Sequence, residues 1–262
     1  MPSRRRTIIA ALALCAFGTF SVPNAAQAKG TKVVKSTFAK EVTKDFKAKQ
    51  PGSKFLGNET VFLLLEFSGR PKKGIVDAVF NFRGEAIGRT NVNFATVNDG
   101  LLFSFGENTF VKFFFKPDPK NPLPLGNFTV DVSVDKVKVG TYPFTIVPPA
   151  DAITTNIASV KIAKEVDENN AVVQLSSVFA TSDTVYLAFT GDYGKSSWLE
   201  AQWTVSGKVV TEGTRSLTLK ENAKGQPGSF SFIPTGGWPI GTHSVQFTVN
   251  GKLIGKYTFT VK

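Results

Sequence analysis

One passage of the chain occurs twice, and this repetition constrains the fold more than any other feature. The stretch GGWPIGTHSVQFTVNGKLIGKYTFTVK closes the chain, and PLGNFTVDVSVDKVKVGTYPFTIV resembles it at an offset of 115 residues. Earlier matches, FAKEV with IAKEV and FLGNETVFLLLEF with FATSDTVYLAFT, share an offset of 124. Because the offset decreases from 124 to 115 along the chain, the first copy has nine extra residues, mostly within TVNDGLLFSFGEN and KPDPKNPLPLG. The chain therefore contains two copies of one module.

Each copy has the length and the alternation of a β-sandwich. In HSVQFTV the residues at 243, 245, 247 and 249 share one face, which we expect to face the core. Asn250-Gly251 then provides a two-residue turn that accepts positive φ at both positions. Repeat 1 has Asp135-Lys136 there, and because lysine is sterically disfavoured at positive φ we expect a different or looser turn.

We predict an all-β fold of two tandem immunoglobulin-like β-sandwiches after a cleaved signal peptide, because each copy spans roughly 110 residues of short strands. The predicted division is a signal peptide at 1–28, a lysine-rich leader with the first strand of repeat 1 at 29–54, the remainder of repeat 1 at 55–147, a linker at 148–156 and repeat 2 at 157–262. Pro148 and Pro149 favour an extended connection.

The first 28 residues have the composition of a secretory signal peptide. Three arginines at 4–6 precede an apolar run, and Ala26-Gln27-Ala28 fits the small-x-small pattern before a cleavage site. The apolar run is shorter than the roughly 20 residues of a spanning helix, so we expect export without a transmembrane span in the mature chain. The opening SRRRTII also resembles a twin-arginine signal, so either export route fits. Cleavage removes Cys15, the only cysteine.

The end of repeat 2 resembles immunoglobulin-like domains of exported bacterial proteins. In those domains a Trp-Pro-x-Gly turn, a short turn with Gly-Lys and a final Phe-x-Val follow one another, as they do at 238–241, 250–252 and 259–261. Repeat 1 departs from the pattern, with Leu-Pro-Leu-Gly at 123–126. The resemblance implies a fold and an envelope or extracellular setting, and it implies no reaction.

Residue types that carry catalysis or bind metals are scarce. His243 is the only histidine, and it aligns with Phe128 in the inward register, so we expect it to pack as an aromatic side chain. The sequence has no G-x-S-x-G motif, no glycine-rich phosphate loop and no EF-hand spacing. We therefore expect a protein that is not an enzyme and needs no metal or cofactor.

The tryptophans all lie in repeat 2. Trp203 falls on the third strand, where we expect it in the core, and Trp238 precedes a proline where we expect it to plug the end of the sandwich. Trp198 has the outward register beside the loop GDYGKSSW. Together with Tyr193 it supports an alternative function, a carbohydrate-binding module that uses exposed aromatic rings.

Positive charge is concentrated in repeat 1. Residues 29–147 hold 18 Lys and Arg against 11 Asp and Glu, whereas residues 148–262 hold 10 against 9. The lysines of the leader either keep an exported protein soluble or attract anionic polymers or lipid head groups. The residues we expect to make an anionic-surface contact are Lys44, Lys47, Lys49 and Lys54.

Three positions with the outward register are more apolar in repeat 1 than in repeat 2. Leu64, Val79 and Phe114 stand where repeat 2 has Ala188, Gln202 and Ser231. An apolar surface on a sandwich marks an interface with a partner, unless the leader or repeat 2 folds over it. We predict partner binding through Leu64, Val79 and Phe114, and both explanations of their apolar character remain open.

Together these features predict a non-enzymatic exported binding or assembly protein of the bacterial envelope, periplasmic or extracellular, that acts through sandwich faces and edges. Its partner is expected to be a protein, an envelope polymer or a second copy of the chain. Nucleic acid is not expected, because the lysine-rich leader at 29–54 lacks an arginine cluster. Besides the carbohydrate-binding module, a periplasmic chaperone-like protein is a further alternative, since such chaperones also have two immunoglobulin-like domains and a basic surface.

Overall fold

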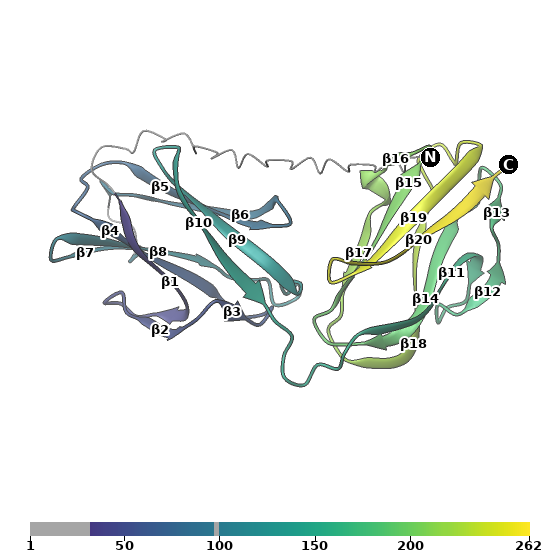
Figure 1. Ribbon diagram of the computed structural model, residues 1–262, viewed down its shortest axis with the longest axis horizontal. Coiled ribbons are helices and arrows are strands. Elements are labelled where there is room, and N and C mark those ends of the chain that lie inside the picture. Colours follow the sequence, from purple (N-terminus) through teal and green to yellow (C-terminus); the bar gives the residue numbers. More distant parts are fainter. Residues whose placement is uncertain (1–31, 97–99) are drawn as a thin grey trace, which may run out of the picture.

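The computed structural model describes residues 32–96 and 100–262, and these residues form two immunoglobulin-like β-sandwiches joined by a short connection (Figure 1). The first domain runs from purple to teal in Figure 1 and the second from green to yellow. The predicted all-β fold of two tandem sandwiches is confirmed. The predicted signal peptide at 1–28 lies outside the described residues. In the described ranges, no helix has the length and apolar character needed to span a membrane.

The first domain consists of two five-stranded sheets. Its strands are β1 (Val33–Val42), β2 (Ala48–Pro51), β3 (Lys54–Phe55), β4 (Val61–Ser68), β5 (Ile75–Phe82), β6 (Glu85–Asn93), β7 (Leu102–Phe105), β8 (Asn108–Phe115), β9 (Gly126–Val134) and β10 (Val137–Ile146). The sheet orders are β2-β1-β4-β8-β7 and β3-β10-β9-β5-β6. The chain changes sheets after β2, and β3 pairs with β10 in parallel.

The second domain repeats this order with one strand fewer in its first sheet. Its elements are β11 (Asn156–Val166), β12 (Val172–Leu175), β13 (Val178–Phe179), β14 (Val185–Tyr193), β15 (Trp198–Val205), β16 (Lys208–Val209), a 3-10 turn (Thr211–Gly213), β17 (Arg215–Thr218), β18 (Ala223–Phe232), β19 (Gly241–Val249) and β20 (Lys252–Val261). The sheets are β12-β11-β14-β18 and β13-β20-β19-β15-β16, with β17 also paired to β15. The second domain, all of which is described, has no counterpart of β7 beside β18. This strand belongs to the extra residues of the first copy.

The core aromatic predictions for the second domain are confirmed. Trp203 is fully buried, and Trp238 is buried with its indole N–H donating to the Asp183 carbonyl at 2.9 Å. His243 is buried as well, since its Nδ1 accepts the Ser206 N–H at 3.2 Å and its Nε2 bonds to a backbone carbonyl. The imidazole is therefore a hydrogen-bonded core ring.

The expectation of a looser final turn in the first domain is wrong. Asp135 and Lys136 have φ values of 48° and 68°, and Asn250 at the corresponding place has 51°. The Asp135 N–H donates to the Ile75 carbonyl, and the Ile75 N–H donates to the Asp135 carboxylate, both at 2.9 Å. Asn250 makes the same two bonds with Trp198, at 2.7 and 2.8 Å. These bonds stabilise the tight turn enough to hold a lysine at positive φ.

The connection between the domains is fastened to the second one. β10 ends at Ile146 and β11 begins at Asn156. The Asn222 side chain donates to the Asp151 carbonyl at 2.7 Å and accepts the Ile153 N–H at 3.1 Å. These bonds order the residues that follow the proline pair.

Candidate functional site

Six phenylalanines gather on the outer side of the sheet β2-β1-β4-β8-β7, and we call this surface the aromatic face. Residues 63 and 65 of β4 and 111 and 113 of β8 are buried in the core, so alternate residues of these strands point outward. The members of the aromatic face are Phe46, Phe62, Phe103, Phe105, Phe110 and Phe114. Phe105 is 70% exposed and Phe114 is 45% exposed. Phe103 is exposed as well, and exposed aromatic rings that gather on one face of a domain often mark a binding surface.

The rings of the aromatic face are ordered by mutual contacts. Phe103 stacks on Phe46 at 5.5 Å between ring centroids and on Phe105 at 6.4 Å, which gives a row from the β1–β2 loop to the edge strand β7. A groove of about 340 Å³ runs beside this row. On the neighbouring strands, the rings of Phe62 and Phe114 lie 5.8 Å apart. The face is thus a fixed arrangement of rings.

Phe46 reaches this position through an unusual backbone conformation. Its φ is 58°, and Asn170, at the corresponding place in the second domain, has φ 65°. Asparagine tolerates this conformation, whereas a bulky residue loses about 1–2 kcal/mol in it. The cost is offset by packing, because Phe46 is buried against Leu64 and holds the Lys112 ammonium 5.2 Å from its ring centroid.

The structure does not bring together the three predicted partner-binding residues. Leu64 has the outward register but is only 9% exposed, because Phe46 covers it, as the leader alternative anticipated. Val79 lies on β5 in the other sheet, where it pairs with Arg89 and Asp131, so it faces away from the aromatic face. The prediction of one surface from these three residues is therefore wrong, and only Phe114 belongs to the exposed part. Register fixes the side of a strand but does not identify its sheet.

Two exposed rings of the aromatic face were not predicted from the sequence. Phe103 and Phe105 lie on β7, within the extra residues of repeat 1. A signal was present in LLFSFGEN, where two phenylalanines alternate with a small polar residue. Phe46 gave no such signal, because its place depends on a loop conformation that is unfavourable for phenylalanine.

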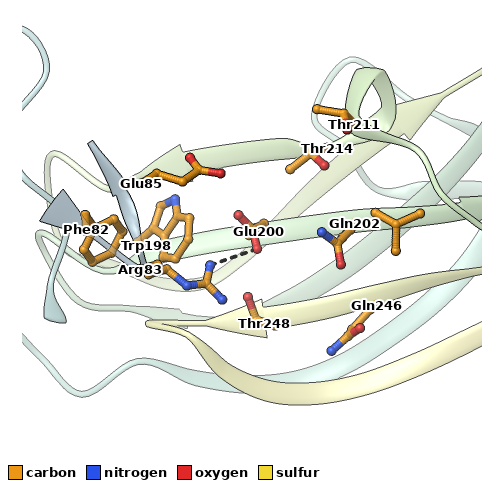
Figure 2. A pocket seen from close by; sticks show the side chains of 11 residues that line it. Phe82, Arg83, Glu85, Trp198, Glu200, Gln202, Thr211, Thr214, Gln246 and Thr248 are labelled. Carbon is orange, nitrogen blue, oxygen red and sulfur yellow. Dashed lines mark hydrogen bonds and ion pairs between the residues drawn. The ribbon is translucent and has the colours of Figure 1, made fainter. Parts of the chain in front are cut away.

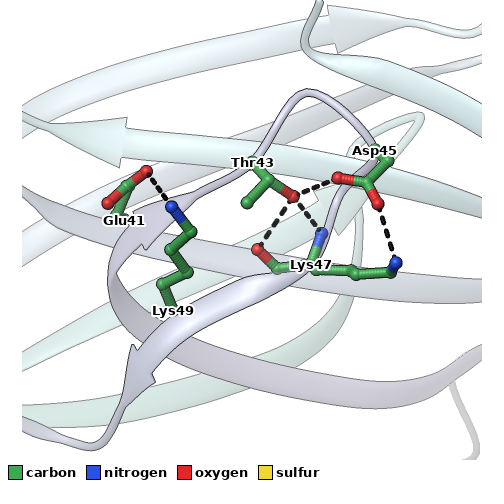
Figure 3. Close-up of polar contacts among 5 residues, drawn as sticks. All are labelled: Glu41, Thr43, Asp45, Lys47 and Lys49. Carbon is green, nitrogen blue, oxygen red and sulfur yellow. Dashed lines mark hydrogen bonds and ion pairs between the residues drawn. The ribbon is translucent and has the colours of Figure 1, made fainter.

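The lysines of the first domain differ in their partners (Figure 3). The Lys47 ammonium lies 2.9 Å from Asp45, and the Lys49 ammonium lies 3.1 Å from Glu41. The Thr43 hydroxyl donates to the Asp45 carboxylate at 2.5 Å, and this bond, helped by Lys47, lowers the pKa of Asp45 to about 2. The same carboxylate raises the pKa of Lys47.

Lys44 and Lys54, the other two lysines of the predicted anionic-surface contact, are exposed and form no ion pair within the described ranges. Lys54 belongs to β3 in the opposite sheet, whereas Lys44 lies in the β1–β2 loop. The four predicted lysines therefore do not form one patch.

The second domain carries a different surface on the corresponding sheet. Its residues at the aromatic-face positions are Asn170, Tyr186, Pro227 and Ser231. Its edge strand β12 exposes Val173 at 59% and Leu175 at 56%. Glu165 and Glu168 are exposed on β11 and on the loop that leads into β12. Within the described ranges Glu165 and Glu168 form no ion pair, and neither do Lys44 and Lys112 beside the aromatic face.

The predicted exposure of the two carbohydrate-binding aromatics is wrong. Tyr193 is buried and donates its hydroxyl to the Gln226 carbonyl at 2.8 Å, and burial, with a smaller contribution from Asp192, raises its pKa to about 12. Trp198 does lie on the outer side of its sheet, but the first domain covers it. The Phe82 ring packs against it in a T-shaped arrangement with the ring centroids 5.5 Å apart, and the Arg83 guanidinium lies 4.8 Å from the Trp198 ring centroid. Neither ring is a free stacking platform.

The contact over Trp198 bounds a pocket between the domains (Figure 2). The pocket has a volume of about 510 Å³. Arg83, at the tip of the β5–β6 turn, pairs with Glu200 of β15 at 3.1 Å across the domain boundary. Within residues 32–96 and 100–262, no group of three or more His, Cys, Asp or Glu side chains is arranged to hold a metal ion.

Comparisons with known proteins add little to this description. No protein-family model matches the chain, and no curated protein is significantly similar to it. Two similar solved structures are a glycosyl hydrolase family 2 member from Bacteroides cellulosilyticus, 9% identical with a TM-score of 0.23, and Bacteroides uniformis beta-glucuronidase 2, 13% identical with a TM-score of 0.20. The matches cover 91% and 87% of this chain but only 29% and 32% of those chains. TM-scores this low carry no functional argument.

Proposed function

We propose that the protein is an exported, non-enzymatic assembly protein of the bacterial envelope, which associates head to tail. In this proposal the aromatic face of one copy contacts the β12 edge of the second domain of the next copy. The observation that carries it is the edge strand β7, which occurs only in the first domain and presents Phe103 and Phe105 to solvent. Export is supported by the signal-like residues 1–28.

β7 is suited to strand addition. It is the last strand of its sheet, so only one of its sides pairs with β8. An edge strand offers unpaired backbone groups to an incoming strand, and exposed side chains at alternate positions supply specificity. The aromatic rings of Phe103 and Phe105 stand at such alternate positions.

A second copy of the chain supplies a matching surface. β12 is also a terminal strand, and Val173 and Leu175 are two residues apart, so they share a side. Pairs of aromatic and aliphatic residues across neighbouring strands stabilise a sheet. Glu165 and Glu168 beside β12 complement Lys44 and Lys112 beside the aromatic face, and such complementarity favours this pairing over a symmetric one.

A contact between two different surfaces leaves one free face and one free edge on every pair. Repetition of the contact therefore extends the assembly, into an open chain or a closed ring. An assembly of this kind fits a structural role at the cell envelope and requires no catalytic group.

Sedimentation velocity on the purified exported chain tests the proposal. The wild type is expected to associate in a concentration-dependent way that weakens with salt. Phe103→Ser with Phe105→Ser, or Val173→Ser with Leu175→Ser, should each give monomers. Ile240→Ser is the matched control, because Ile240 is 76% exposed on a turn outside both surfaces.

Two results would contradict this function. A wild-type chain that stays monomeric over the whole concentration range rules out self-assembly. Loss of association in only one double variant shows that the other surface is not part of the contact. A monomer that instead captures an extended client segment through β7 would favour the chaperone-like alternative.

A further inference from the structure

The pocket between the domains is a second candidate site, independent of the aromatic face. Its floor is the outer side of β15 and β19, with Gln202 and Gln246 among its residues. One wall is the 3-10 turn with Thr211, and the other is the β5–β6 turn of the first domain. Figure 2 shows the side chains that line the pocket. The volume of about 510 Å³ is in the range of small-molecule sites.

Thr248 gives an independent indication of a ligand. Its residue is only 7% exposed, and its hydroxyl has no hydrogen-bond partner among the described residues. Figure 2 shows this hydroxyl directed into the pocket. Buried hydroxyl groups are almost always paired, since an unpaired one destabilises the fold. The corresponding residue of the first domain, Ser133, is more exposed to solvent, so the unpaired group is particular to this junction.

The polar groups of the pocket identify the ligand class. Arg83 is the one cationic side chain among the residues that line the pocket, and it is paired with Glu200, while Glu85 adds a second carboxylate, so the charge of the pocket disfavours an anion. The amides of Gln202 and Gln246 each donate and accept, as the hydroxyls of a sugar do. The floor is the face of a sheet whose backbone groups are paired, which leaves no ladder for a peptide.

We infer that this pocket binds a short neutral saccharide. The hydroxyl of Thr248 and the amides of Gln202 and Gln246 bond to its hydroxyl groups, and Trp198 and Val209 provide apolar contact for the face of a sugar ring. Trp198 serves as part of a wall, already covered on one side by Arg83, and not as an exposed platform. These contacts all come from the second domain, and the β5–β6 turn of the first domain closes the pocket beside them.

A glycan array with the full chain, followed by calorimetric titration of the best neutral disaccharide, tests this inference. Thr248→Val and Gln202→Leu are each expected to weaken binding at least tenfold. Thr248→Val should leave the melting temperature of the free protein unchanged or raise it, because the variant removes an unpaired buried hydroxyl. Thr258→Val is the matched control, since Thr258 is exposed on β20 outside the pocket.

The double variant Phe103→Ser with Phe105→Ser should bind the disaccharide like the wild type, which separates this site from the proposed assembly. The inference is overturned if no neutral saccharide on the array binds. It is also overturned if Thr248→Val and Gln202→Leu both bind with wild-type affinity.

Discussion

The substitution Phe46→Asn gives the first domain the residue that the second domain has at the corresponding position, Asn170. It removes the packing of the Phe46 ring and also relieves the strain of its positive φ, so its effect on stability shows which of the two is larger. Burial of a phenylalanine contributes about 3 kcal/mol, and the ring and ammonium contacts of Phe46 add about 1 kcal/mol. Asparagine tolerates the positive φ of this position, which stabilises the variant by about 1–2 kcal/mol relative to phenylalanine. Packing therefore wins, and we expect the first domain to lose about 2 kcal/mol, or about 10 °C in melting temperature.

The two domains can be followed separately. All three tryptophans lie in the second domain, so their fluorescence reports that domain, while calorimetry reports both. Phe46→Asn should lower one calorimetric transition and leave the midpoint of the fluorescence transition in place. Phe46→Ala and Phe46→Gly isolate the strain, because both remove the ring and only glycine accepts positive φ freely.

Phe46→Gly is therefore expected to be more stable than Phe46→Ala by about 1 kcal/mol. Equal stability of the glycine and alanine variants would refute the strain. A Phe46→Asn variant more stable than the wild type would refute the claim that packing outweighs it.

Three further predictions concern charge and buried polar groups. On a dextran sulfate column, the double variant Lys44→Gln with Lys54→Gln should elute at lower salt than the double variant Lys47→Gln with Lys49→Gln. Lys47 and Lys49 are already paired with carboxylates, so their loss weakens binding to the polymer less; equal elution of the two double variants would contradict this. Burial raises the pKa of Tyr193 in the folded protein, so its contribution to stability is complete below pH 10 and is lost as the pH rises toward 12. Because burial also raises the pKa of Tyr142 and Tyr257, the test is the amplitude of the tyrosinate absorbance step near pH 12, and an unchanged amplitude in Tyr193→Phe would contradict the prediction. The first domain has phenylalanine at the position of His243, yet His243→Phe should destabilise the second domain by about 2 kcal/mol, because it leaves the Ser206 N–H and the Pro239 carbonyl unpaired. A denaturant titration followed by tryptophan fluorescence measures this, and an unchanged midpoint would show that these bonds do not stabilise the domain.

The sequence contained enough to predict the fold and the inner faces of the strands. The duplicated passage predicted two modules, strand position and alternation placed Trp203 and His243 in the core, and the turn before Pro239 placed Trp238 at the end of the sandwich; all three are buried. These features depend on neighbours along the chain, and the period of a strand is a local property. The turn at Asp135-Lys136 escaped prediction because bonds to Ile75, sixty residues away along the chain, stabilise it.

The candidate surfaces were harder to predict because they depend on contacts between distant segments. Leu64 has the outward register, yet Phe46 covers it, and Trp198 has the outward register, yet the β5–β6 turn covers it. The exposed rings Phe103 and Phe105 lie in residues that repeat 2 lacks, so comparison of the two copies could not reveal them. Register therefore predicts the side of a side chain but not what lies above it.

Head-to-tail association is tested most directly by mixing the two double variants, Phe103→Ser with Phe105→Ser and Val173→Ser with Leu175→Ser, in equal amounts. One variant keeps an intact β12 edge and the other keeps an intact aromatic face, so a single contact between them remains available. Sedimentation velocity should show monomers for each variant alone, heterodimers for the mixture and no larger species. A mixture that sediments as monomers, at concentrations where the wild type associates, would contradict the proposed assembly.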